Sequence, residues 1–249
     1  MVVVYWYVVK GGIAVGVQTV FERYEIKYRI TRAQQARLIQ AVAPYMQADE
    51  YGVHTIRNVY FDTPNHRLIR RSLEKPVYKE KLRVRCYATA TAETPVFVEL
   101  KKKYKGVVHK RRILLPHDQA MALLCDRREA GDTQILREIA YFMDYYGDLR
   151  PMMYLAYDRQ AFYGREDSRL RLTFDTNIRW REDRLRLTEP PDGRSLVDED
   201  TVLMEIKTAG ALPLWLTDLL TEEKIYKSSF SKYGTAYLET VKEGFEYAR

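Results

Sequence analysis

The segment YKEKLRVRCY, residues 78–87, places four basic side chains at alternate positions. Successive side chains of a β-strand point to opposite faces, so the cations share one face and the apolar residues share the other. The four cations are Lys79, Lys81, Arg83 and Arg85. At a separation of about 7 Å and an effective dielectric of about 20, each neighbouring pair of like charges costs roughly 2 kcal/mol. Open solvent would relieve most of this cost, whereas a concave site would require a bound anion.

Four further segments alternate in the same way, and three of them add one glutamate to the charged face. Their charged faces carry Glu25, Lys27 and Arg29; Glu99, Lys101 and Lys103; Arg169, Arg171, Thr173 and Asp175, opposite Leu170, Leu172, Phe174 and Ile178; and Glu205 and Lys207. For any single strand, a solvated face of an antiparallel sheet is the alternative explanation. Solvated faces usually mix Thr, Ser and both charge signs, whereas these five faces repeat Lys and Arg. Together they favour a shared, charged interior.

Composition limits the classes of protein and partner. The 249 residues are 46% hydrophobic and 30% charged, which is typical of a globular protein rather than a disordered chain. Lys and Arg outnumber Asp and Glu by 41 to 34, and the resulting charge of +7 favours an anionic partner: nucleic acid, a phosphate-rich ligand or an acidic membrane. The two cysteines have no metal-ligand spacing, so we expect neither a disulfide framework nor a zinc site, and a cytoplasmic location.

Hydrophobic periodicity predicts an α+β protein with mostly antiparallel pairing. Strands are expected at 22–30, 56–62, 77–88, 95–104, 106–115, 153–163, 168–180, 184–188 and 201–208, and helices at 31–44, 117–128, 133–146, 213–220 and 233–247. KYKG, YGRED and WRED are interpreted as tight hairpin connections. We expect residues 21–249 to form a single domain, with residues 1–20 as an N-terminal extension or an extra strand.

The charged faces and the helices are most economically combined in an antiparallel β-barrel that forms a tunnel, with a charged interior and helices packed outside. Such an interior conflicts with stability unless a polyanion occupies it. Arg and Lys suit phosphate oxygens. Carboxylates among these cations suit Mg²⁺ or Mn²⁺, since hard divalent cations take oxygen ligands and usually arrive with phosphate.

Eight segments in order resemble the polyphosphate polymerase domain of the vacuolar transporter chaperone (VTC) family, within the CYTH or triphosphate tunnel metalloenzyme superfamily. They are RYEIKY, IRNVYFDTPN, KLRVRCY, VFVELKKKYKGVVHKRR, YDRQAFYG, LRLTFDTNIRW, LMEIKT and KSSFSKYGTAY, and the similarity covers roughly residues 21–240. The resemblance implies an antiparallel tunnel barrel that transfers the γ-phosphate of ATP onto a growing polyphosphate chain with Mn²⁺ or Mg²⁺. ATP and polyphosphate are then the expected partners, and no nucleic acid is expected.

The resemblance also implies roles for particular residues. Phosphate binding and catalysis fall to Lys27, Arg83, Arg85, Lys101, Arg159, Arg171 and Lys232. Further candidates for substrate binding are Lys79, Lys81, Lys110, Lys207 and Lys227. Glu205 is the expected metal ligand. Glu25 and Glu99 lie on charged faces by alternation, and we expect them either to support the metal or to hold cations in place. Arg23 stands where the superfamily often carries another glutamate, which favours one metal ion over two.

Other functions remain open at this point. A tunnel-type triphosphatase would use the same cations with water as the nucleophile, and a non-catalytic protein would bind polyphosphate or inositol phosphates without turnover. Nucleic-acid binding through the 20 tyrosines is less favoured, because most of them occupy apolar positions of strands or helices. Phosphoryl transfer depends on positioning and charge stabilisation, so it requires no Ser-His-Asp or Cys-His set. A membrane-protein partner that receives the product is compatible with this interpretation.

Overall fold

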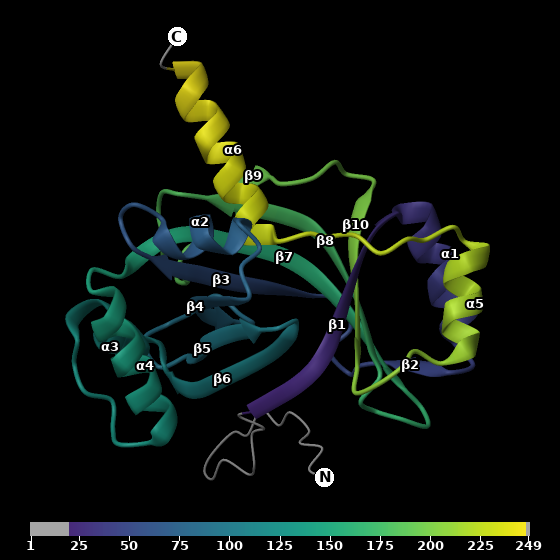
Figure 1. The fold of residues 1–249 in the computed structure, drawn as a ribbon, viewed down its shortest axis with the longest axis horizontal. Coiled ribbons are helices and arrows are strands. Elements are labelled where there is room, and N and C mark those ends of the chain that lie inside the picture. Colours follow the sequence, from purple (N-terminus) through teal and green to yellow (C-terminus); the bar gives the residue numbers. More distant parts are fainter. Residues whose placement is uncertain (1–19, 248–249) are drawn as a thin grey trace.

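Ten antiparallel strands and six helices make up the described part of the protein (Figure 1). This computed structural model describes residues 20–247, so the proposed extension or extra strand at the N-terminus lies, except for Val20, outside the described residues. The strands are β1 Val20–Thr31, β2 Met46–Ala48, β3 His54–Asp62, β4 Tyr78–Cys86, β5 Pro95–Tyr104, β6 Val107–Pro116, β7 Arg150–Gly164, β8 Arg171–Arg181, β9 Arg194–Ser195 and β10 Thr201–Thr208. The helices are α1 Arg32–Val42, α2 Arg67–Leu73, α3 His117–Asp126, α4 Gln134–Tyr146, α5 Leu214–Glu222 and α6 Lys232–Tyr247.

The strand pairings form a ring. The order is β7-β3-β4-β5-β6-β1-β10-β8, and an additional pairing of β7 with β8 joins the two ends, while β2 and β9 flank the ring. Every pairing is antiparallel. The predicted α+β fold, an antiparallel tunnel barrel with helices outside, is therefore confirmed.

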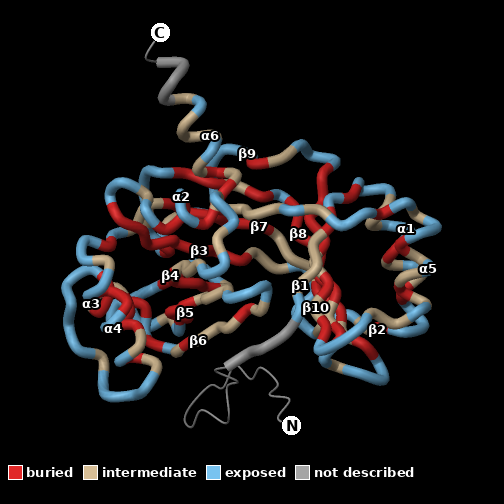
Figure 2. Tube along the Cα trace, in the orientation of Figure 1, coloured by how far each residue is buried: buried red, intermediate tan, exposed pale blue. Residues whose placement is uncertain are grey.

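Two apolar cores lie on the outside of the ring, beneath helices. On one side α3 and α4 cover strands whose outward residues include Leu82 and Val84, both fully buried. On the other side α1 and α5 cover β1, β8 and β10, where Ile206 is fully buried against Leu38 and its neighbours. Figure 2 shows these buried strand segments within an exposed periphery. The apolar side of the YKEKLRVRCY segment thus faces helices, which leaves its basic side for the interior.

Part of the interior is apolar, which differs from the uniformly charged interior expected from the sequence. Leu155, Ile178 and Trp180 from β7 and β8 pack with Tyr233 at the start of α6. Alternation predicts Ile178 on the face opposite Asp175, and this prediction is wrong. The register of β7 and β8 shifts between Ala156 and Asp158, and Asn177 has a left-handed φ of 47°, so a bulge turns the following residues inward.

Several local predictions are confirmed and others are corrected. Thr31 caps α1 with a complete capping box, in which its side chain accepts from Gln34 N at 3.1 Å. The strand expected at 184–188 does not form, and WRED opens a long connection to β9 rather than a tight hairpin. Arg184 has a left-handed φ of 44°, which breaks the extended backbone, and Leu187 packs into an outer core. The sequence does not predict the short elements α2, β2 and β9, because each contains too few residues to show a clear hydrophobic periodicity.

Within residues 20–247, none of the helices has both the length and the apolar character that crossing a bilayer requires.

Candidate functional site

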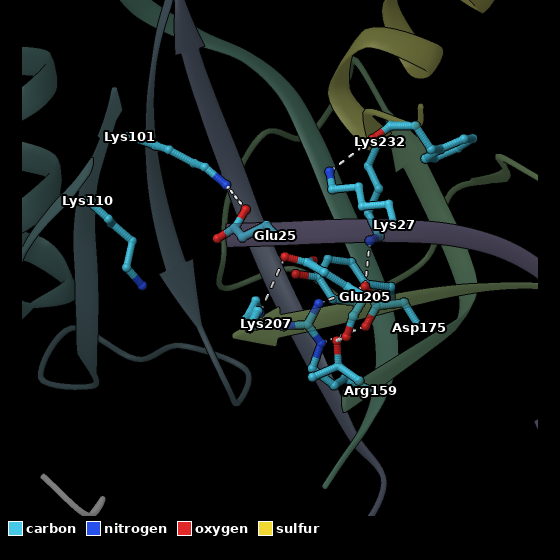
Figure 3. Close-up of polar contacts among 12 residues, drawn as sticks. Glu25, Lys27, Lys101, Lys110, Arg159, Asp175, Glu205, Lys207 and Lys232 are labelled. Atoms are coloured by element: carbon cyan, nitrogen blue, oxygen red, sulfur yellow. Dashed lines mark hydrogen bonds and ion pairs between the residues drawn. The ribbon is translucent and has the colours of Figure 1, made fainter. Parts of the chain in front are cut away.

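The interior of the ring gathers charged side chains from strands that are distant in sequence. Figure 3 shows cations from β1, β5, β6, β7, β10 and α6 around three carboxylates. They are Lys27, Lys101, Lys110, Arg159, Lys207 and Lys232 around Glu25, Asp175 and Glu205. The structure therefore brings together most of the residues that the sequence marks as site residues.

Two of these carboxylates lie on neighbouring strands. In the β1–β10 register Glu25 is opposite Lys207 and Lys27 is opposite Glu205. Each carboxylate therefore faces a lysine on the neighbouring strand. Glu25 Oε2 accepts from Lys101 Nζ at 2.6 Å, and Glu205 Oε1 lies 3.5 Å from Lys207 Nζ. Burial would raise the pKa of Glu205, but the charges of Lys207, Lys27 and Lys101 outweigh it and hold this pKa well below its usual value. Both carboxylates are ionised in the neutral range.

Glu25 and Glu205 lie close enough to affect one another. Burial and the negative charge of Glu205 both act to raise the pKa of Glu25, but Lys101 and Lys207 oppose them, so the pKa of Glu25 is lowered. Two ionised carboxylates kept side by side imply a strongly positive local environment. Burial conversely lowers the pKa of Lys27, which donates from Nζ to the Phe230 carbonyl at 2.9 Å.

A second group is centred on Asp175 of β8, whose side chain is 1% exposed. Arg159 binds it through two bonds of 2.6 and 2.7 Å, and Lys232 donates to Oδ2 at 2.5 Å. Burial would raise the pKa of Asp175, but Arg159 and Lys232 lower it. Lys232 and Arg159 also lie over the ring of Tyr157, at 4.4 and 5.1 Å from its centroid.

A third group surrounds Glu99 of β5, whose side chain is 1% exposed. Its Oε2 lies 2.6 Å from Arg83 and 3.8 Å from Arg85, and its Oε1 accepts from Lys110 at 3.2 Å. Arg83 also donates to Tyr60, and Arg85 donates to Asn58 and Tyr157. Both carboxylate oxygens of Glu99 are engaged by cations, so the geometry favours the second of its two expected roles, which is to hold cations in place.

The remaining candidates lie around these groups. Lys81 donates to Ser231 Oγ at 2.9 Å, and Lys79 donates to the Ser72 carbonyl at 3.0 Å. Arg171 lies opposite Lys207 in the β8–β10 register. Lys227 is exposed, on a segment whose backbone bridges to β1 at Tyr28, so the described contacts do not bring it into the interior cluster.

The donor set fits a divalent cation that arrives with phosphate. Among the residues whose placement is described, no group of three or more His, Cys, Asp or Glu side chains forms a protein-only metal cage. Mg²⁺ is typically held by one or two carboxylates, with waters and substrate phosphates completing its shell. Glu205 and Glu25 meet that requirement, since both are ionised and face the same interior.

The site also contains hydrogen-bond partners whose roles are not evident from the sequence. Asp175 alternates with Arg171 on β8 and so could have been chosen as a counterion. Arg83 and Arg85 donate to Asn58 and Tyr60 of β3 and to Tyr157 of β7, but nothing in the order of the residues indicates those pairings.

Comparison with known proteins agrees with this architecture. A candidate adenylate cyclase from Bacillus halodurans superposes with a TM-score of 0.52 at 15% identity, covering 84% of this chain and 95% of that one. A candidate adenylyl cyclase from Hippeastrum, described as having a dominant triphosphatase activity, superposes with a TM-score of 0.49 at 20% identity, covering 85% of this chain and 93% of that one. The first similarity shows a shared fold.

Sequence comparison is more specific. No curated protein sequence matches the chain. The profile of the VTC domain matches residues 22–241, which span the ring except for the first two residues of β1, and most of α6. The chain therefore belongs to the VTC domain family.

Proposed function

We propose that this protein is a metal-dependent polyphosphate polymerase, which transfers the γ-phosphate of ATP onto the end of a polyphosphate chain. The observation that carries the proposal is the ionised pair Glu25 and Glu205, set on adjacent strands among cations from the rest of the ring. A cluster of this kind suits a substrate that is rich in phosphate and accompanied by a divalent metal. Membership of the VTC domain family supports the same substrate class.

In this proposal the side chains bind and align two phosphate groups. Lys27, Lys101 and Lys207 lie beside the carboxylates and would neutralise the donor phosphates, while Arg159 and Lys232 form a second positive group on β7 and α6. The terminal phosphate oxygen of the chain forms a bond to the γ-phosphorus, the bond from that phosphorus to the β–γ bridging oxygen breaks, and ADP leaves. Positioning and charge stabilisation supply the catalysis.

Glu205, together with Glu25, would hold Mn²⁺ or Mg²⁺, which when bound would neutralise the phosphate oxygens. The side chains of Lys207 and Lys101 keep these carboxylates ionised, as their lowered pKa values require. Glu99 is enclosed by its cations and would hold Arg83, Arg85 and Lys110 in place.

The decisive experiment follows the γ-phosphate. Purified protein is incubated with γ-labelled ATP and Mn²⁺, and polyphosphate is resolved from free phosphate on a gel, with α-labelled ATP as the control for specificity of transfer. Label in a polymer supports the polymerase. Label in free phosphate alone identifies a tunnel-type triphosphatase, and no turnover together with tight polyphosphate or inositol phosphate binding identifies a non-catalytic binding protein.

A further inference from the structure

The inward faces of β4 and β5 form a ladder of paired residues that runs from the site to the end of the strands. Arg83 is opposite Glu99, Lys81 is opposite Lys101, and the outermost pair is Lys79 opposite Lys103. Same-face residues on a strand are about 7 Å apart, so the ladder presents charge at regular intervals. Its inner part is the cluster already described, and its outer part lies where α2 ends, beside Ser72.

Charge compensation decreases along this ladder. The inner pair is itself an ion pair, at 2.6 Å, and Lys101 of the middle pair lies 2.6 Å from Glu25. Within the described part of the chain, neither lysine of the outer pair has a carboxylate within ion-pairing distance. Burial lowers the pKa of Lys79, and the like charges of Lys103 and Lys75 lower it further. The outer pair therefore carries positive charge that no carboxylate of the described residues balances.

The opposite face of the same hairpin shows that this imbalance is specific to the inward side. Lys102 alternates with Lys101 and Lys103 but points outward, where Glu138 of α4 lies 3.9 Å from its Nζ. Arg111 of β6 shares the same carboxylate at 3.3 Å. Cations on the outer face are thus paired by a helix, whereas among the described residues no carboxylate pairs with Lys79 or Lys103 on the inward face.

We propose that Lys79 and Lys103 form a subsite for the extended polyphosphate chain, beyond the triphosphate-sized site at Glu25 and Glu205. The subsite follows directly from Lys101, which contacts Glu25, so a linear polyanion could bind both without a break in positive charge. This inference rests on the proposed function for the identity of the ligand. The polyphosphate chain would then extend past the end of the ring at which β4 begins and β5 ends.

The test compares a short with a long ligand in the absence of ATP. Tripolyphosphate and long-chain polyphosphate are titrated by calorimetry into the wild type and into Lys79→Ala/Lys103→Ala. The expected result is a loss of about tenfold in affinity for the long chain. Two partly exposed charge contacts together contribute about 1.4 kcal/mol, which corresponds to a tenfold change in Kd. The loss for tripolyphosphate should be much smaller. The dependence of long-chain affinity on salt should also weaken, because fewer counterions are released.

Two further variants make the result specific. Lys102→Ala removes a lysine from the outer face of the same hairpin and should change neither affinity, while Lys79→Arg/Lys103→Arg keeps both charges and should retain long-chain binding. Melting temperatures confirm that each variant is folded. Equal losses for the short and long ligands, or an equal loss in Lys102→Ala, would overturn the subsite. The experiment also separates the two proposals. If the protein makes no polymer from ATP but the double variant still loses affinity for the long chain alone, the polymerase is ruled out and the subsite stands. If the protein makes polymer but the double variant binds both ligands as the wild type does, the subsite is ruled out and the polymerase stands.

Discussion

Lys232 Nζ donates to Asp175 Oδ2 at 2.5 Å, which ties the first residue of α6 to strand β8 inside the ring. Arg159 binds the same carboxylate through both of its oxygens. The cations therefore reach the site from a strand and from a helix that lies 57 residues further along the chain than Asp175. This carboxylate holds the two positive groups together in the free protein.

Asp175→Asn should destabilise the free protein by about 3–5 kcal/mol, because two cations lose their buried partner. Urea denaturation would measure the loss. Tripolyphosphate should raise the melting temperature of the variant more than that of the wild type, since a bound anion replaces the missing charge. Asp144→Asn, which removes the partner of Arg127 in an exposed pair on α4, is the control and should cost less than about 1 kcal/mol. A variant as stable as wild type, with an unchanged ligand response, would contradict the role assigned to Asp175.

Glu205→Gln should remove turnover while leaving polyphosphate binding largely intact. The substitution keeps the shape of the side chain but removes a charge that the cations of β1 and β10 hold ionised. Turnover would be followed with γ-labelled ATP across a Mn²⁺ titration. Glu25→Gln should shift the midpoint of the Mn²⁺ titration to a higher metal concentration, because one carboxylate of the proposed metal site loses its charge. The matched control is Glu138→Gln, on the outer face, and near wild-type turnover in Glu205→Gln would rule out that residue as the metal ligand.

Glu99→Gln should behave differently from both, because Glu99 is enclosed by Arg83, Arg85 and Lys110. We expect a loss of about 3–5 kcal/mol in the free energy of unfolding, as buried cations lose their counterion. At a temperature where the variant is still folded, its Mn²⁺ midpoint should match that of the wild type. A shifted midpoint with unchanged stability would instead make Glu99 a metal ligand.

Alternation along single strands allowed much of this site to be predicted. Leu82 and Arg83 point to opposite sides because a regular strand has a period of two, and the sign of the charge then indicates which side is the interior. The rule fails at Asn177, where a left-handed residue inserts a bulge and Ile178 joins the face of Asp175. No residue type in that stretch signals the bulge unambiguously.

Contacts between side chains of strands that are distant in the sequence could not be predicted. Lys101 and Glu25 are 76 residues apart, and their contact depends on β5, β6 and β1 being neighbours in the ring. The YGRED hairpin predicts that β7 and β8 are neighbours, but the register that sets Asp175 opposite Arg159 does not follow from the order of the residues. The contacts that could not be predicted depend on the order and register of the strands in space, and not on the chemistry of any one residue.

Lys110 is expected to make the binding of a phosphate ligand sensitive to pH. Its side chain is 14% exposed and its Nζ lies 3.2 Å from Glu99 Oε1. Burial lowers its pKa to about 7, with the charges of Arg112, Arg85 and Arg83 acting in the same direction and Glu99 opposing them. Above that pH the free protein loses one positive charge next to the site, and an anion that binds must restore the proton.

Tripolyphosphate affinity should therefore fall as the pH rises through about 7, by at most about tenfold for each further pH unit, and binding should take up a proton. Lys110→Arg keeps its charge over this range, so its affinity should exceed that of the wild type increasingly above pH 7. Calorimetry in two buffers of different ionisation enthalpy would measure the proton uptake directly. Ionisation of the ligand affects both proteins equally and cancels in their ratio. Lys102→Arg controls for a lysine outside the ring, and parallel pH profiles for the wild type and Lys110→Arg would show that Lys110 does not titrate in the site.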